Sequence, residues 1–215
     1  MVFRRRVFPL AALTAALAGC AGEGDLVLTQ GVGITAVLST CPTVGIPDYT
    51  GDVTTFRGDT QTFAELDVSA TMTNLRTTCD EGAEKIYSEA SFDVFAQRMD
   101  PRGARTVTVP YFVTVLRGGS AVVTKRVGEV TLSFADGETR AQGSGKAGSF
   151  IDRASASLPP EIREKITRRR RPGDVDAALD PLADPEVKAA IARTRYEMLV
   201  GFQLTEEQLK YNVTR

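Results

Sequence analysis

Hydrophobic and polar residues alternate along much of the chain between residues 26 and 152. In the segment 66–73, apolar side chains occupy the even positions and polar side chains the odd ones. A period of two places successive side chains on opposite faces of a strand, so this segment is predicted to be a half-buried β-strand. Less regular alternation predicts further strands at 33–39, 92–97, 107–115, 121–124, 130–134 and 140–150.

Short turn sequences separate these predicted strands. Gly118-Gly119 and Asp136-Gly137 are typical of tight hairpins, while Pro110 indicates an edge strand or a bulge. Two packed sheets bury the one-sided apolar faces of six to eight such strands. We therefore expect residues 26–152 to form a mainly β, antiparallel β-sandwich of immunoglobulin or fibronectin type III architecture. A small barrel is the alternative.

The pattern changes to a helical one in the last third of the chain. Pro159-Pro160 predicts a helix over 161–168, and Asp184-Pro185-Glu186 is a typical helix start for a segment expected to run to about Val200. Thr205 and Gln208 have the spacing of a capping box, which predicts a last helix over 206–212. Residues 153–215 are thus expected to form a helical C-terminal appendix.

Composition restricts the chemistry more than it identifies it. The 215 residues include 42% hydrophobic residues and carry a net charge of −1, which is typical of a folded protein and argues against a basic nucleic-acid binder. The chain contains no histidine, which excludes Ser-His-Asp and Cys-His catalysis and His-ligated zinc. We therefore expect a non-enzymatic protein without a cofactor. The alternatives are a hydrolase using carboxylates or a Ser/Lys pair, and a carrier of lipids or small ligands.

The first 20 residues have the order of a bacterial export signal. Arg4, Arg5 and Arg6 precede an apolar stretch over 7–17, which is too short to span a bilayer. The segment closes with Leu17, Ala18, Gly19 and Cys20, which resembles the lipobox of bacterial lipoproteins. The alternatives are an ordinary secretory signal with a chance cysteine and a buried N-terminal helix.

The lipoprotein resemblance implies a location. Residues 1–19 would be removed, Cys20 would carry the lipid, and residues 20–25 would form a short tether to the domain. Ala21 stands where an Asp usually signals retention in the inner membrane, so the resemblance implies the periplasmic face of the outer membrane. Several acyl chains give a durable anchor.

Two cysteines remain after the lipidated one. Export places Cys41 and Cys79 in an oxidising compartment, where two cysteines have one possible pairing. A reactive thiol is the alternative, but the chain has neither a C-x-x-C motif nor a histidine to act as a base.

One cluster of basic residues stands out in this slightly acidic chain. The candidate anion-binding residues are Arg163, Lys165, Arg168, Arg169, Arg170 and Arg171. Guanidinium groups bind phosphate through paired hydrogen bonds, so lipid phosphates or an acidic protein are candidate ligands. The alternative is a solvated helix end, because cations suit a helix C-terminus and Asp174, Asp176, Asp180 and Asp184 follow closely.

Three weaker patterns favour structural roles. The spacing of Asp174 and Asp176 resembles part of a calcium loop but lacks its glycine and closing glutamate. The acidic group Asp80, Glu81 and Glu84 offers acid–base chemistry but is more typical of a solvated turn. The glycines at 143, 145 and 148 lack the context of a nucleotide loop and indicate a bulged or edge strand.

These observations lead to one expectation about function. We expect a lipid-anchored envelope protein that binds another envelope protein or assists envelope assembly, with the membrane and an envelope protein as partners and no nucleic acid. We expect this protein to have no metal site and no catalytic site.

Overall fold

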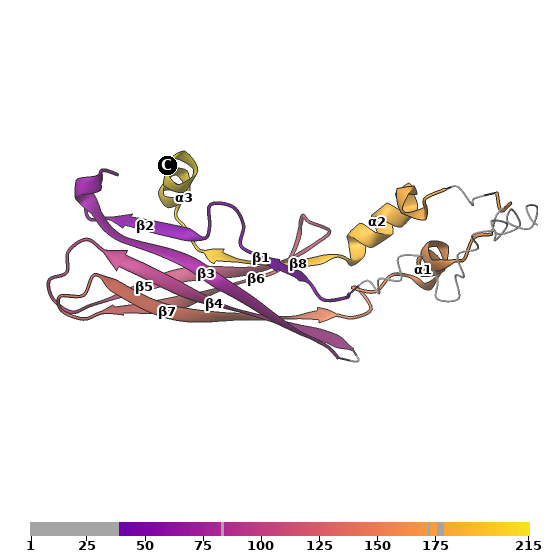
Figure 1. Cartoon of the computed structure of the whole chain (residues 1–215), viewed down its shortest axis with the longest axis horizontal. Helices are drawn as coiled ribbons and strands as arrows, with labels where there is room; N and C mark the ends of the chain where they lie inside the picture. Colours follow the sequence, from indigo (N-terminus) through magenta and orange to yellow (C-terminus); the bar gives the residue numbers. More distant parts are fainter. Residues whose placement is uncertain (1–38, 83, 172, 176–178) are drawn as a thin grey trace, which may run out of the picture. The chain divides into compact units, whose positions relative to one another are not determined.

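Two four-stranded β-sheets form the body of the protein. The computed structural model describes residues 39–215 except 83, 172 and 176–178. The first sheet has the strand order β1-β8-β5-β6 and the second β2-β3-β4-β7 (Figure 1). Their bounds are β1 Thr43–Gly45, β2 Asp52–Phe56, β3 Leu66–Glu81, β4 Lys85–Arg98, β5 Arg105–Arg117, β6 Ala121–Phe134, β7 Arg140–Asp152 and β8 Tyr196–Phe202.

Three α-helices and two short 3-10 turns complete the described chain. The helices are α1 Pro160–Thr167, α2 Pro185–Thr194 and α3 Glu206–Thr214, and the turns are Phe63–Glu65 and Pro181–Ala183. Among the described strands, β1 pairs with β8 in parallel and the other neighbouring strands pair in antiparallel. The predicted β-sandwich with a C-terminal helix is confirmed, and the predicted strand at 33–39 lies outside the described residues apart from Ser39.

The core follows from the alternation of the strands. On β4, every even-numbered residue from Ile86 to Arg98 is buried, while the odd-numbered residues are half-buried or exposed. Leu132 of β6 and Val200 of β8 are also fully buried. The apolar faces of the two sheets therefore pack against each other.

The prediction that one helix runs from Asp184 to about Val200 is wrong. Helix α2 ends at Thr194, and Tyr196–Phe202 forms strand β8 between β1 and β5. Tyr196, Met198 and Val200 are buried at every second position, which is the period of a strand. Pairing with β5 satisfies the backbone groups of this segment and overrides its helical pattern.

This correction changes the meaning of residues 153–195. They leave the sandwich after β7 and return to it as β8, so we call them the helical insertion. Only α3 follows the last strand, and it begins at the predicted capping box of Thr205 and Gln208. The buried Asn212 of α3 donates hydrogen bonds to the carbonyls of Tyr49 and Asp52, which fixes this helix beside β2.

The expectation that Pro110 marks an edge or a bulge is also wrong. Strand β5 lies between β8 and β6, and its register shift falls at Val115/Leu116 instead. The carbonyl of Pro110 accepts a hydrogen bond from the backbone N–H of Gln203, one residue beyond the end of β8. In a strand, the backbone nitrogen of a residue points to the same side as its carbonyl oxygen. The N–H that proline lacks would therefore point toward Gln203, which lies beyond β8, so no hydrogen bond between β5 and a residue of β8 is lost.

The glycines of β7 make room for aromatic side chains. A Cβ atom on Gly145 would lie 2.3 Å from the Phe92 ring, and one on Gly148 would lie 2.6 Å from the Tyr87 hydroxyl. Phe92 packs edge-on against Tyr111 with ring centroids 5.0 Å apart, and the Tyr111 hydroxyl donates to the Lys146 carbonyl at 2.7 Å. These glycines belong to an edge strand, as predicted, and Gly145 makes room for an aromatic side chain packed between the sheets.

A buried arginine organises one end of the sandwich, which we call the Arg98 end. The Arg98 side chain is 2% exposed and donates to four backbone carbonyls at 2.7 to 2.8 Å, those of Glu138, Gly103, Pro101 and Ala135. Its guanidinium also lies 5.2 Å from the centre of the Phe134 ring. Arg98 thereby joins the β4–β5 turn to the β6–β7 turn.

The opposite end, which we call the insertion end, carries the disulfide. Cys41 and Cys79 are bonded, with Cα atoms 6.2 Å apart, so the predicted pairing is confirmed. The bridge joins the segment before β1 to the C-terminal part of β3, and therefore links the two sheets.

Candidate functional site

The helical insertion has a small apolar cluster of its own. Ile162 of α1 packs with Val187 and Ala190 of α2, and this cluster is separate from that of the sandwich. Helix α1 begins at consecutive prolines, as predicted, and Asp184 caps α2 by accepting from the Glu186 N–H. Two short helices thus support the basic residues at the end of α1.

The structure places Lys165 in an ion pair within the insertion. Its Nζ lies 2.6 Å from Asp184 Oδ2 and 3.3 Å from Glu186 Oε2. The hydrogen bond with Lys165 holds the pKa of the Asp184 carboxyl below its usual value, and the same contact raises the pKa of Lys165. Lys165 therefore fixes α1 against the start of α2. Because it is paired within the insertion, we do not count it among the cations that bind an anion from outside the protein.

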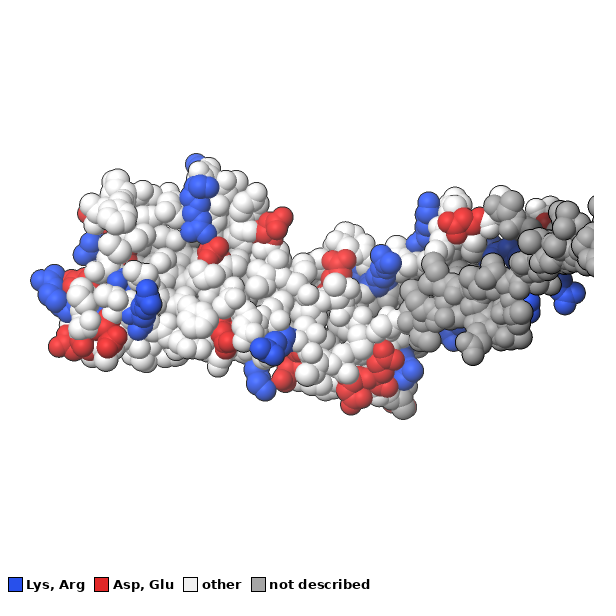
Figure 2. Space-filling model, in the orientation of Figure 1, with Lys and Arg blue, Asp and Glu red and all other residues white. Residues whose placement is uncertain are grey.

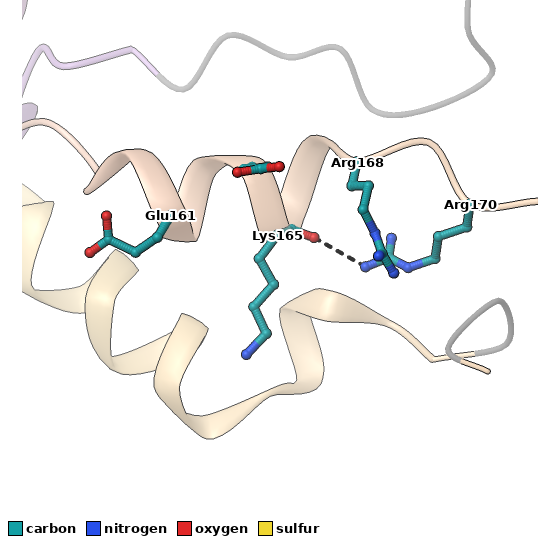
Figure 3. A pocket seen from close by; sticks show the side chains of 5 residues that line it. Glu161, Lys165, Arg168 and Arg170 are labelled. Carbon is teal, nitrogen blue, oxygen red and sulfur yellow. Dashed lines mark hydrogen bonds between the residues drawn. The ribbon is translucent and has the colours of Figure 1, made fainter. Parts of the chain in front are cut away.

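Two arginines of the run, Arg168 and Arg170, line an open pocket at the end of α1. Glu161, Glu164, Lys165, Arg168 and Arg170 line a volume of about 340 Å³, in which both signs of charge meet (Figure 3). The Arg170 guanidinium donates to the Lys165 carbonyl at 3.1 Å, which satisfies part of the helix terminus. Arg163, Arg169 and Arg171 are exposed. The run thus combines local contacts with outward-facing guanidinium groups.

The aspartates that follow the run mostly bind backbone groups. Asp174 accepts from the Arg171 N–H and Asp180 from the Leu182 N–H, while Asp176 lies outside the described residues. Asp184 pairs with Lys165, a member of the candidate set. Across the described residues, no group of three or more Asp, Glu or Cys is arranged to hold a metal ion.

The acidic group near Cys79 lies at the insertion end. The Ser39 hydroxyl donates to Glu81, and the Arg153 guanidinium donates to the carbonyls of Glu81 and Gly82 at 3.0 and 2.8 Å. A second open pocket of about 480 Å³ lies beside it and is lined by Glu84, Lys85, Asp152, Arg153, Ala154 and Ser157. Both pockets are lined largely by charged side chains, unlike the apolar cavity that a lipid carrier needs.

Elsewhere, two carboxylates with lowered pKa values are held in ion pairs. Hydrogen bonding to Arg105 lowers the pKa of Asp67, and hydrogen bonding to Lys146 lowers the pKa of Glu89. A general acid at neutral pH needs the opposite shift. These two groups therefore have the properties of structural carboxylates.

Strand β6 is a further candidate site, which sequence reasoning did not identify. It is an outer strand of its sheet, and Val122, Val123 and Val127 on it are 63%, 55% and 58% exposed. Lys125 and Arg126 are exposed among these valines. The signal in the sequence was the segment 121–129, in which valines continue without a clear alternation.

The predicted lipidation residues Leu17, Ala18, Gly19 and Cys20 lie outside the described residues. No helix in the part of the chain that the structure describes is both long and apolar enough to cross a membrane. No protein-family profile matches the chain, and no curated protein or solved structure is significantly similar to it.

Proposed function

We propose that this chain is a non-enzymatic, lipid-anchored module of the bacterial cell envelope that binds an extended segment of another envelope protein. The observation that carries the location is the Cys41–Cys79 disulfide, because such bridges persist in oxidising compartments. It agrees with an export signal that ends at Cys20. The favoured location is the periplasmic face of the outer membrane, because Ala21 follows Cys20 where an Asp usually signals retention in the inner membrane.

The exposed edge of β6 supports the binding role. An extended peptide can add to a sheet edge through main-chain hydrogen bonds, and its side chains then pack on exposed apolar residues such as Val123 and Val127. Lys125 and Arg126 would repel the same strand of a second copy. Charge complementarity therefore favours a partner strand that carries acidic side chains.

The anchor is tested by mass spectrometry of protein extracted from membranes. Cys20 should begin the mature chain and carry acyl groups, and Cys20→Ala should abolish both the modification and the membrane association. An unmodified chain that keeps residues 1–19 would contradict the proposed location.

The binding role is tested by photo-crosslinking in intact cells. A photoreactive residue at Val127 should yield a discrete crosslinked product that maps to an extended, acidic segment of an envelope protein. The matched control is Val213 of α3, a valine 52% exposed. Equal labelling from both positions, or none from Val127, would refute binding at this edge.

A further inference from the structure

Packing of the sandwich does not account for the helical insertion. The insertion leaves and returns at one place, since the Ser155 and Tyr196 hydroxyls lie 2.8 Å apart. The Gly118 N–H donates to the Arg195 carbonyl where the chain re-enters the sheet. Between these points, α1 and α2 bury their apolar residues against each other rather than in the sandwich core. We therefore expect this element to have a role other than stabilising the sandwich.

The insertion begins at the same end of the sandwich at which the described chain starts. The Ser39 hydroxyl donates to the Glu81 carboxylate at the end of β3, and the guanidinium of Arg153, which precedes α1, donates to the carbonyl of the same Glu81. The polypeptide from Cys20 to Ser39 spans at most about 65 Å even when fully extended. A lipid on Cys20 would hold this end within that distance of the membrane surface.

The charges of the insertion depend on the four consecutive arginines. Residues 153–195 contain ten Lys and Arg against seven Asp and Glu, so changing Arg168–Arg171 to glutamine leaves six cations against seven acids. The run alone therefore gives this element its positive sign. Figure 2 shows basic and acidic side chains along the visible face, with wide stretches that carry neither.

We infer that the Arg168–Arg171 run binds the phosphates of anionic lipid headgroups beside the anchor, an inference that rests on the proposed lipidation of Cys20. Guanidinium groups match phosphate geometry with paired hydrogen bonds. The carboxylates of Asp184 and Glu186 are occupied by Lys165, which holds α1 in place while the run follows its C-terminus. Acyl chains and basic residues then act as two membrane signals on one end of the protein.

The test measures binding of the unacylated chain, residues 21–215, to vesicles with 30% phosphatidylglycerol and 70% phosphatidylcholine. Each cation near such a surface changes the partition coefficient by about fivefold. We expect Arg168–Arg171→Gln to weaken binding at least tenfold, and raising salt from 0.05 to 0.5 M to weaken wild-type binding similarly. Unchanged melting curves would show that the variant folds.

A matched control removes the same charge elsewhere. Changing Arg57, Arg102, Arg140 and Lys210 to glutamine alters four exposed cations of the sandwich and of α3, and should weaken binding less than twofold. Equal losses in the two variants, or no binding by the wild type, would overturn the inference. Acylated Cys20 without any effect of the arginines would overturn it and leave the proposed anchor standing. Arginine-dependent vesicle binding by a chain that cells do not acylate would overturn the proposed anchor and leave phosphate binding by the run standing.

Discussion

Replacing Arg98 tests the physical account of the Arg98 end most directly. Arg98→Met keeps an unbranched side chain of similar reach to the aliphatic part of arginine and removes four charge-assisted hydrogen bonds, each worth about 1.5–3 kcal/mol in proteins. These contributions are not additive, because water reaches some of the released carbonyls. We therefore expect a loss of at least about 4 kcal/mol in the free energy of unfolding, or about 8–16 °C in Tm.

Urea denaturation followed by circular dichroism measures this loss. Arg102→Met is the matched control, since this arginine lies in the adjoining turn with 87% of its side chain exposed and should cost less than about 1 kcal/mol. Arg98→Lys should fall between them, because an ammonium keeps the charge but has three donors and cannot span the same carbonyls. A loss below about 1.5 kcal/mol for Arg98→Met at an unchanged denaturant slope would refute the reasoning.

Four further outcomes are expected. A chain that ends at Asp152 should not fold, because it lacks β8, whereas replacing residues 157–194 with a short Gly-Ser linker should preserve the strand signal in circular dichroism. Gly145→Val should lower stability by about 1–3 kcal/mol in urea titrations, because its side chain overlaps the facing ring. Asp67 has a pKa lowered by its arginine partner, so its stabilisation is present above about pH 4 and is lost as pH falls through the folded-state pKa; melting curves of Asp67→Asn should differ from wild type at pH 7 and converge in acid. Reducing Cys41–Cys79 should lower Tm, with about 4 kcal/mol expected from loop closure.

The sequence predicted the strands in which one face is buried and the other is exposed. It missed the strands whose burial depends on neighbouring elements. Segment 66–73 alternates because one face meets the core, and β3 contains it. Strand β2 was missed because its adjacent residues Val53 and Thr54 are both buried, which removes the alternation. Burial by neighbouring elements, including α3 beside β2, cannot be read from five residues.

Strand β8 shows a different limit. Its apolar residues satisfy both a helical period continued from Val187 and a strand period from Tyr196 onward. The choice between them depends on pairing with β5, about 85 positions earlier, which no local pattern contains. Of the candidate site, the basic residues were found from the sequence, but the ion pair of Lys165 with Asp184 depends on how α1 packs on α2.

The position of the disulfide gives the proposed anchor a mechanical consequence. Tension on Cys20 would enter the described domain through the segment before β1, a strand that pairs with β8 over three residues. Cys41 precedes β1, so the bridge passes this tension to Cys79 on β3, which pairs with β4 over twelve residues. A short terminal strand detaches far more readily than the middle strand of a sheet, because fewer hydrogen bonds must open. The bridge therefore protects the weakest strand of the sandwich at the point where an anchored chain would be pulled.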